Sequence, residues 1–249
     1  MTAIASMAAT FWRTAGGAPP FPRSIEEPLL WTFPVAVVRL PRLGLSGVKA
    51  YLAGVQVPCP FTGPDRRIRA CLVARRGEAL VFLDGTDPLD EQRFSLAHEA
   101  SHFLLDYHRP RQAALRRLGR DILPVLNGER PPLPAERIDA VLLGVTVQIY
   151  GHMMDRGWSG EVVHMQTLEA EDRADRLALE LLAPWAAVVA VATATGLAFD
   201  NAEAGAAIAR IIQGSFGLPG PVAARYSPLV LSGLRRPQSF RQWLGVPRD

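Results

Sequence analysis

The residues of this sequence best suited to chemistry are two histidines and a glutamate in the stretch 94–105. They form the pattern His98-Glu99-x-x-His102. In an α-helix, residues four apart project from the same face about one turn apart, so the two imidazoles can take adjacent corners of a tetrahedral zinc site. Glu99 follows the first histidine directly, which puts its carboxylate close enough to hold a metal-bound water without being a ligand itself.

The residues around this pattern favour a rigid, buried helix. No Gly or Pro interrupts the stretch, and the flanking residues are apolar: Leu96, Ala97, Phe103, Leu104 and Leu105. The same pattern can also come from two core or surface histidines that bind nothing, so a metal site needs a third ligand from another part of the chain.

A second helical stretch, 169–184, offers that ligand. Its apolar face consists of Ala174, Leu177, Ala178, Leu181 and Leu182. Glu171 falls on or beside this face, and a carboxylate directed inwards needs a partner such as a zinc ion held by two histidines. Asp175 shares its side of the helix and can accept a hydrogen bond from the far nitrogen of a ligating histidine. The alternative, a solvated acidic helix start, accounts better for Glu169 and Asp172 than for Glu171.

Composition limits the class of protein. A chain of 249 residues with 49% hydrophobic residues suits one large domain, or a main domain with a small appendage. The net charge of +3 is too small to indicate binding to nucleic acid or to an anionic membrane. Cys59 and Cys71 form no disulfide framework, and the first residues lack a basic signal segment, so we expect a cytoplasmic location.

One uncharged stretch, 181–199, requires a test for a membrane span. Pro184 interrupts it near its start, and the remaining Ala-Val run is shorter than a bilayer requires. We therefore expect a buried helix and no membrane association.

The expected fold class is α+β and mainly helical. Strands are predicted at 35–40, 68–74 and 79–83, with a short additional strand near 48–52, and the turn at 75–78 makes a hairpin of the second and third. The result is a small three-stranded sheet followed by the helix that carries His98. Strand 79–83 is our candidate for an edge strand that holds substrate backbone beside the site, although a purely structural hairpin is equally compatible.

After the first motif, helices are predicted at 112–123 and 135–154. Tyr150, His152 and His164 lie around the end of the second helix, where any of them could donate a proton to a tetrahedral intermediate, although packed or solvated side chains are the preferred interpretation. Helices at 185–199 and 201–213 precede a segment with helix-turn-helix cadence, 214–226. Its prolines and few basic residues argue against a DNA reader, so we expect a structural or protein-contacting helical bundle.

Two ordered blocks of the sequence resemble the ImmA/IrrE-type metallopeptidases. Residues 93–102 are similar to that family's R-F-[ST]-L-A-H-E-x-x-H block, and residues 171–184 are similar to its E-x-x-A-[ND]-x-F-A-x-x-L-L-x-P block. The resemblance implies a minimal zincin-like fold in which one zinc ion is bound by His98, His102 and Glu171, with Glu99 as general base. Leu177 replaces the family's usual Phe, and the segment between the blocks is longer than in compact members.

These observations give a domain scheme and two functional hypotheses. The scheme has an N-terminal lead (1–30), a zincin-like metallopeptidase domain (31–199) with an insertion at about 107–165, and a C-terminal helical region (200–249). The first hypothesis is a zinc-dependent endopeptidase that makes a selective cut in a regulatory protein, such as a helix-turn-helix transcriptional repressor; this substrate is implied by the resemblance alone. The alternative is a non-catalytic zinc-containing regulatory or protein-binding module, against which the intact Glu99 argues. The sequence leaves the oligomeric state open.

Overall fold

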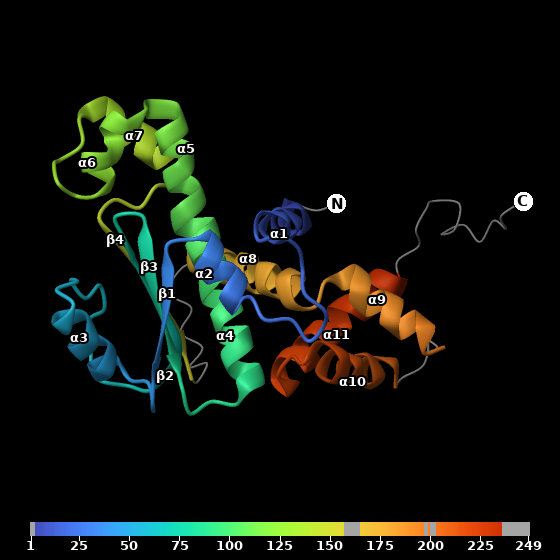
Figure 1. Ribbon diagram of the computed structural model, residues 1–249. Helices are drawn as coiled ribbons and strands as arrows, with labels where there is room; N and C mark the ends of the chain where they lie inside the picture. The colour runs from blue at the N-terminus through green and yellow to red at the C-terminus, as the bar shows by residue number, and fades with distance from the viewer. Residues whose placement is uncertain (1–2, 157–164, 197–198, 200–202, 236–249) are drawn as a thin grey trace, which may run out of the picture. The chain divides into compact units, whose positions relative to one another are not determined.

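The computed structural model describes residues 3–156, 165–196, 199 and 203–235. By contacts the chain divides into two compact units, one of Met1–Pro19 with Ser24–Leu181 and one of Pro20–Arg23 with Leu182–Asp249. The predicted class, mainly helical α+β, is confirmed: helices accompany a four-stranded mixed sheet (Figure 1).

The sheet contains β1 (Val35–Leu40), β2 (Ile68–Arg75), β3 (Glu78–Asp84) and β4 (Ile149–Asp155) in the order β1-β3-β2-β4. The predicted hairpin of β2 and β3 is confirmed, and β1 runs parallel to β3. Because β3 lies between β1 and β2, the prediction that strand 79–83 is an edge strand is wrong. The edges of the sheet are β1 and β4, and β4 is the strand that the three-stranded prediction lacked.

β4 replaces the second half of the helix predicted at 135–154. Helix α7 (Pro134–Leu142) ends early, and β4 pairs antiparallel with β2. Ile149 and Met153 pack into the core on one face of the sheet, which by alternation turns Tyr150 and His152 to the other face. At Gly151 a Cβ atom would lie 2.6 Å from Pro60 Cγ, so only glycine allows this approach. The apolar residues of the segment fit the period of a helix as well as that of a strand, and the pairing with β2 selects the strand.

Helix α3 (Leu45–Gly54) covers one face of the sheet, and α4 (Leu89–His102) lies on the opposite face (Figure 1). The strand predicted near 48–52 is therefore wrong. The side chains of Val48 and Leu52 enter the apolar core beneath α3, and this amphipathic helical burial outweighs the β-propensity of the valine. The short helix α2 (Glu26–Thr32) precedes β1, and α1 (Ala3–Thr14) belongs to the same unit.

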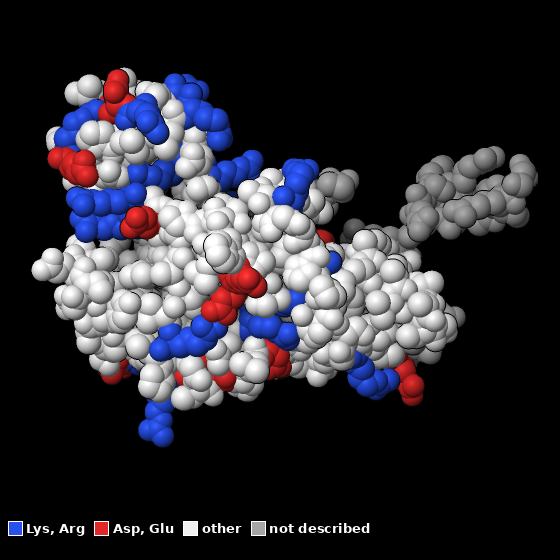
Figure 2. Space-filling model, in the orientation of Figure 1, with Lys and Arg blue, Asp and Glu red and all other residues white. Residues whose placement is uncertain are grey.

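α4 continues without a break into a π-helical segment, η1 (Phe103–His108), and then into α5 (Arg109–Leu118). The helix predicted at 112–123 thus begins earlier and ends at Gly119, whose φ of 76° ends the helical run. The turn η2 (Arg120–Ile122) and helix α6 (Leu123–Leu126) follow. Arginine side chains gather over α5, α6 and α7 (Figure 2).

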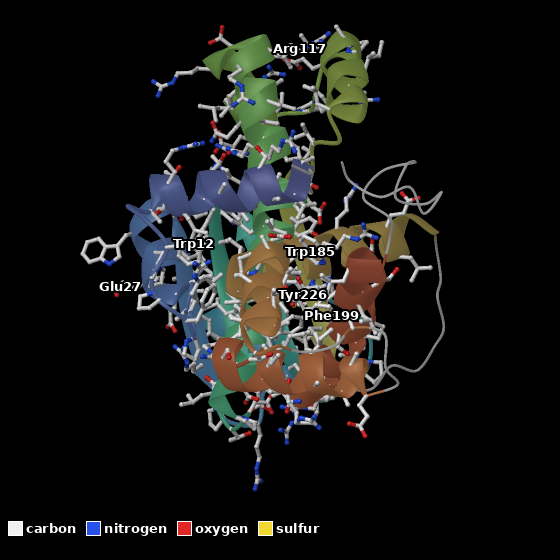
Figure 3. All side chains as sticks on the ribbon, turned by 90° about the vertical axis from the view of Figure 1, so that its right-hand side faces the viewer. Trp12, Glu27, Arg117, Trp185, Phe199 and Tyr226 are labelled. Atoms are coloured by element: carbon white, nitrogen blue, oxygen red, sulfur yellow. The ribbon has the colours of Figure 1, made fainter. Side chains whose placement is uncertain are left out.

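The C-terminal unit contains α9 (Trp185–Ala194), α10 (Ala204–Phe216) and α11 (Gly220–Arg235). Tyr226, labelled with Trp185 in Figure 3, donates a hydrogen bond to the carbonyl of Ala183 at 3.2 Å. The segment with helix-turn-helix cadence forms the end of α10, the left-handed Gly217 and the start of α11. The tail 236–249 lies outside the described residues.

Helix α8 (Met165–Leu182) leads from the first unit into the second. Within the described residues no single helix has the length and apolar composition of a membrane span. The pair Leu168–Leu182 and Trp185–Ala194, bent by 50°, meets that test only when taken together.

Candidate metal centre

α4 buries the two predicted histidines side by side. His98 and His102 are 3% and 1% exposed, and their ring centroids lie 4.8 Å apart. Glu99, between them in sequence, is fully buried. Imidazole and carboxylate groups are costly to bury without partners, so the site must be organised by its polar neighbours.

α8 brings the predicted third ligand to these histidines. Its apolar residues Ala174, Leu177, Ala178, Leu181 and Leu182 are all buried, as the sequence pattern predicts. Glu171 lies at the edge of that face, with Oε2 3.3 Å from His98 Nε2 and Oε1 3.6 Å from His102 Nε2. The structure thus brings together residues that the sequence places in two separate blocks.

β4 adds a third imidazole. His152 Nε2 lies 2.8 Å from Glu171 Oε1, its Nδ1 lies 2.9 Å from Glu99 Oε2, and its ring stacks on His102 with centroids 3.6 Å apart. The ligand atoms of His98, His102, His152 and Glu171 all lie within 4.8 Å of one another, so the four residues could hold one metal ion. The sequence pattern predicts a helix here and favours a packed or solvated His152, with proton donation as the alternative, whereas the structure places this residue among the ligand atoms.

The three histidines are held in the same way. Each ring is hydrogen-bonded through Nδ1 to a carboxylate: His98 to Asp175 at 2.9 Å, His102 to Asp106 at 2.8 Å and His152 to Glu99 at 2.9 Å. An ionised carboxylate only accepts, so each Nδ1 carries the proton and each Nε2 is directed towards Glu171. The contact of Asp175 with a histidine is the one predicted from the sequence. The contact of Asp106 was missed, although an acidic residue four positions after His102 was a usable signal.

The cluster fits a metal ion. The buried atoms His98 Nε2, His102 Nε2 and Glu99 Oε1 have no hydrogen-bond partner. Metal–ligand bonds of about 2.0 Å in a tetrahedron put neighbouring ligand atoms ~3.3 Å apart. Glu171 Oε1 lies 3.6 Å from His102 Nε2 and 2.8 Å from His152 Nε2, and the other oxygen, Oε2, lies 3.3 Å from His98 Nε2. These separations scatter around the tetrahedral value. Imidazoles with one carboxylate suit zinc or a similar transition metal better than magnesium or calcium.

The buried histidines and carboxylates of the cluster shift one another's pKa values. Burial lowers the pKa of His98, but the hydrogen bond to Asp175 and the neighbouring Glu171 carboxylate outweigh it and raise the pKa to about 9. Burial likewise opposes the charge on His152, and Glu99 and Glu171 raise its pKa to about 10. Burial raises the pKa of Glu99 and of Glu171, yet the neighbouring histidines bring both below their ordinary value. A metal bound here would displace protons from the histidines.

Tyr150 lies beside the cluster but is not one of the four ligand residues. The Tyr150 hydroxyl is 3.4 Å from Asp106 and 3.5 Å from His102 Nδ1, and burial with the nearby acidic groups holds its pKa far above its ordinary value. Tyr150 therefore lies at the Nδ1 side of His102, away from the ligand atom Nε2. Cys59 packs against the core under α3, on the opposite face of the sheet. His164 lies outside the described residues.

Comparison of the chain with protein-family models, with curated proteins and with solved structures found no match.

Proposed function

We propose that this chain is a zinc-dependent peptidase in which His98, His102 and Glu171 hold the ion and Glu99 is the general base. The observation that carries the proposal is the convergence of two buried imidazole nitrogens and a carboxylate beside a fully buried glutamate. The two sequence blocks that resemble ImmA/IrrE-type metallopeptidases supply these same residues from two separate helices, α4 and α8, and so support the same interpretation.

Each residue has a defined part in this proposal. A zinc ion held by these residues would lower the pKa of a bound water to about 7, and the ion would polarise a peptide carbonyl. Glu99, whose lowered pKa keeps it ionised at neutral pH, accepts a proton at a carboxylate oxygen and passes it to the leaving amine. Asp175 and Asp106 fix the ring orientation and tautomer of the two ligand histidines.

The substrate strand has a new candidate position. Among the described residues β4 pairs with β2 alone, so its other side is a free edge to which a peptide backbone can add. β4 carries His152 beside the metal cluster, whereas the previously favoured β3 is interior. We therefore propose that the substrate is a protein bound along β4. A selective cut in a cytoplasmic regulatory protein, such as a helix-turn-helix repressor, rests on the family resemblance alone.

A non-catalytic zinc module is the second candidate, and one contact favours it. Glu99 accepts a hydrogen bond from His152 at 2.9 Å and thereby orients that ring. The glutamate thus has a positioning role that a purely structural site would also need.

The test pairs metal analysis with Glu99→Gln, using Glu169→Gln on the exposed start of α8 as the matched control. We expect one zinc per chain in all three proteins. Hydrolysis of a proteome-derived peptide library should proceed in the parent and the control and fall by about 10²–10⁴-fold in Glu99→Gln. The peptidase proposal would be refuted by a protein that contains no metal after purification and takes up none when zinc is added. It would also be refuted if Glu99→Gln cleaved peptides as fast as the parent.

A further inference from the structure

His152 is arranged like the two histidines of α4. All three rings present Nε2 towards Glu171, and all three are hydrogen-bonded at Nδ1 to a carboxylate. Of the three contacts with Glu171, the one from His152 is the shortest, at 2.8 Å. A histidine serving only as a proton donor has no need of this position among the ligand atoms.

Four protein ligands change what the site can do. Structural zinc sites have four protein ligands, whereas catalytic sites keep one tetrahedral position for water. With His98, His102, Glu171 and His152 all bound, the tetrahedron is full. Glu99 is also occupied, because its Oε2 accepts a hydrogen bond from His152 Nδ1.

We propose that His152 is a fourth, displaceable ligand, so that the metal site is closed in this conformation and opens when His152 leaves the ion. The inference rests on the proposed peptidase function for its consequence, which is that the closed form is latent. It does not depend on that function for the coordination itself.

The elements that carry the ligands indicate which one leaves. His98 and His102 lie on α4, which is buried against the sheet, and Glu171 lies on α8, whose apolar face is buried. His152 lies on the edge strand β4, whose pairing with β2 has a register shift between Ile68 and Ala70. Edge strands are held by one neighbour only, so β4 can move at lower cost than either helix.

One movement would change two groups together. When the ring of His152 withdraws, the fourth position becomes available to water, and Glu99 Oε2 loses its hydrogen-bond donor. That oxygen is then free to accept a proton. Since the outer edge of β4 is also the proposed place for the substrate backbone, substrate binding and opening of the site would be coupled through this strand.

The test uses cobalt(II) in place of zinc, with acetohydroxamate as a probe for an open position. In the parent protein we expect a four-coordinate cobalt spectrum that acetohydroxamate alters only at concentrations well above those that change the spectrum of His152→Ala, because the probe must first displace His152. In His152→Ala we expect one cobalt bound at least about tenfold more weakly, with a spectrum that acetohydroxamate changes. His152→Gln, which keeps a donor for Glu99, serves if the alanine variant does not fold. Met154→Leu, on the same face of β4, is the matched control and should behave like the parent.

The outcomes separate this inference from the peptidase proposal. A parent spectrum that responds to acetohydroxamate as readily as that of His152→Ala, or unchanged cobalt affinity in His152→Ala, overturns the fourth ligand. If the spectra are as expected and neither protein cleaves peptides, the ligand stands and the peptidase fails. If both are correct, His152→Ala cleaves peptides faster than the parent; slower cleavage at unchanged metal affinity would make His152 a proton donor instead and overturn the inference.

Discussion

The protons held by the metal cluster predict how the free energy of unfolding depends on pH. Without metal it should fall as the pH rises above about 7, and with zinc bound it should not change over the same range. In the metal-free protein the pKa values of His98 and His152 are about 9 and about 10, against 6.5 for an unperturbed histidine. Because these values are raised, the two histidines contribute stability that is fully present below about pH 6.5 and is lost as the pH rises towards 9 and 10.

The size of the effect follows from linkage. Between about pH 7 and 9 the folded, metal-free protein keeps protons that the unfolded chain has released, at about 1.4 kcal/mol per pH unit for each proton. Two histidines that share carboxylates titrate together, so the slope should lie between about 1.4 and 3 kcal/mol per unit. A domain of ordinary stability has about 5–15 kcal/mol to lose, which makes the slope readily measurable.

With zinc bound the histidines are neutral, as they are in the unfolded chain above about pH 6.5, so the slope in this window should vanish. Urea denaturation at several pH values, with chelator or with zinc, measures both profiles. Asp175→Asn should flatten the metal-free profile by removing a partner of His98. His108→Gln is the control, because burial lowers the pKa of His108 and takes its titration below the window. A flat metal-free profile, or an equal slope with zinc, would refute the shared-proton description of the cluster.

Two further predictions concern single carboxylates. Asp84 has a fully buried side chain that accepts hydrogen bonds from Thr86, Arg67 and Arg156, so Asp84→Asn should cost about 3 kcal/mol in urea denaturation without changing zinc stoichiometry. An Asp84→Asn protein as stable as the parent would show that these ion pairs contribute nothing net. Asp106→Asn should weaken zinc binding by about 10–100-fold in a chelator competition, because it removes the acceptor for His102 Nδ1. Asp121→Asn, an exposed change in η2 beyond α5, should leave zinc affinity unaltered, and equal affinities in both variants would contradict the role of Asp106.

The sequence by itself determined the parts of the site that depend on helical periodicity. His98, Glu99 and His102 occupy one buried stretch of α4, and the apolar face of α8 directs Glu171 and Asp175 inwards, because helical spacing fixes which side chains share a face. The β2–β3 hairpin can likewise be predicted from the sequence, since its turn and its strands are local features. The predicted domain boundaries remain a prediction.

Only the tertiary structure decided the position of His152 and the order of the sheet. Residues 149–154, the end of the helix predicted at 135–154, have an apolar pattern that suits a helix as well as a strand. Only their pairing with β2, far away in the sequence, selects the strand. That pairing makes β4 an edge and turns His152 towards Glu171 and Glu99. Helical contacts come from neighbours along the chain and can be read from spacing, whereas a strand's partner and facing depend on non-local contacts that the local sequence does not encode.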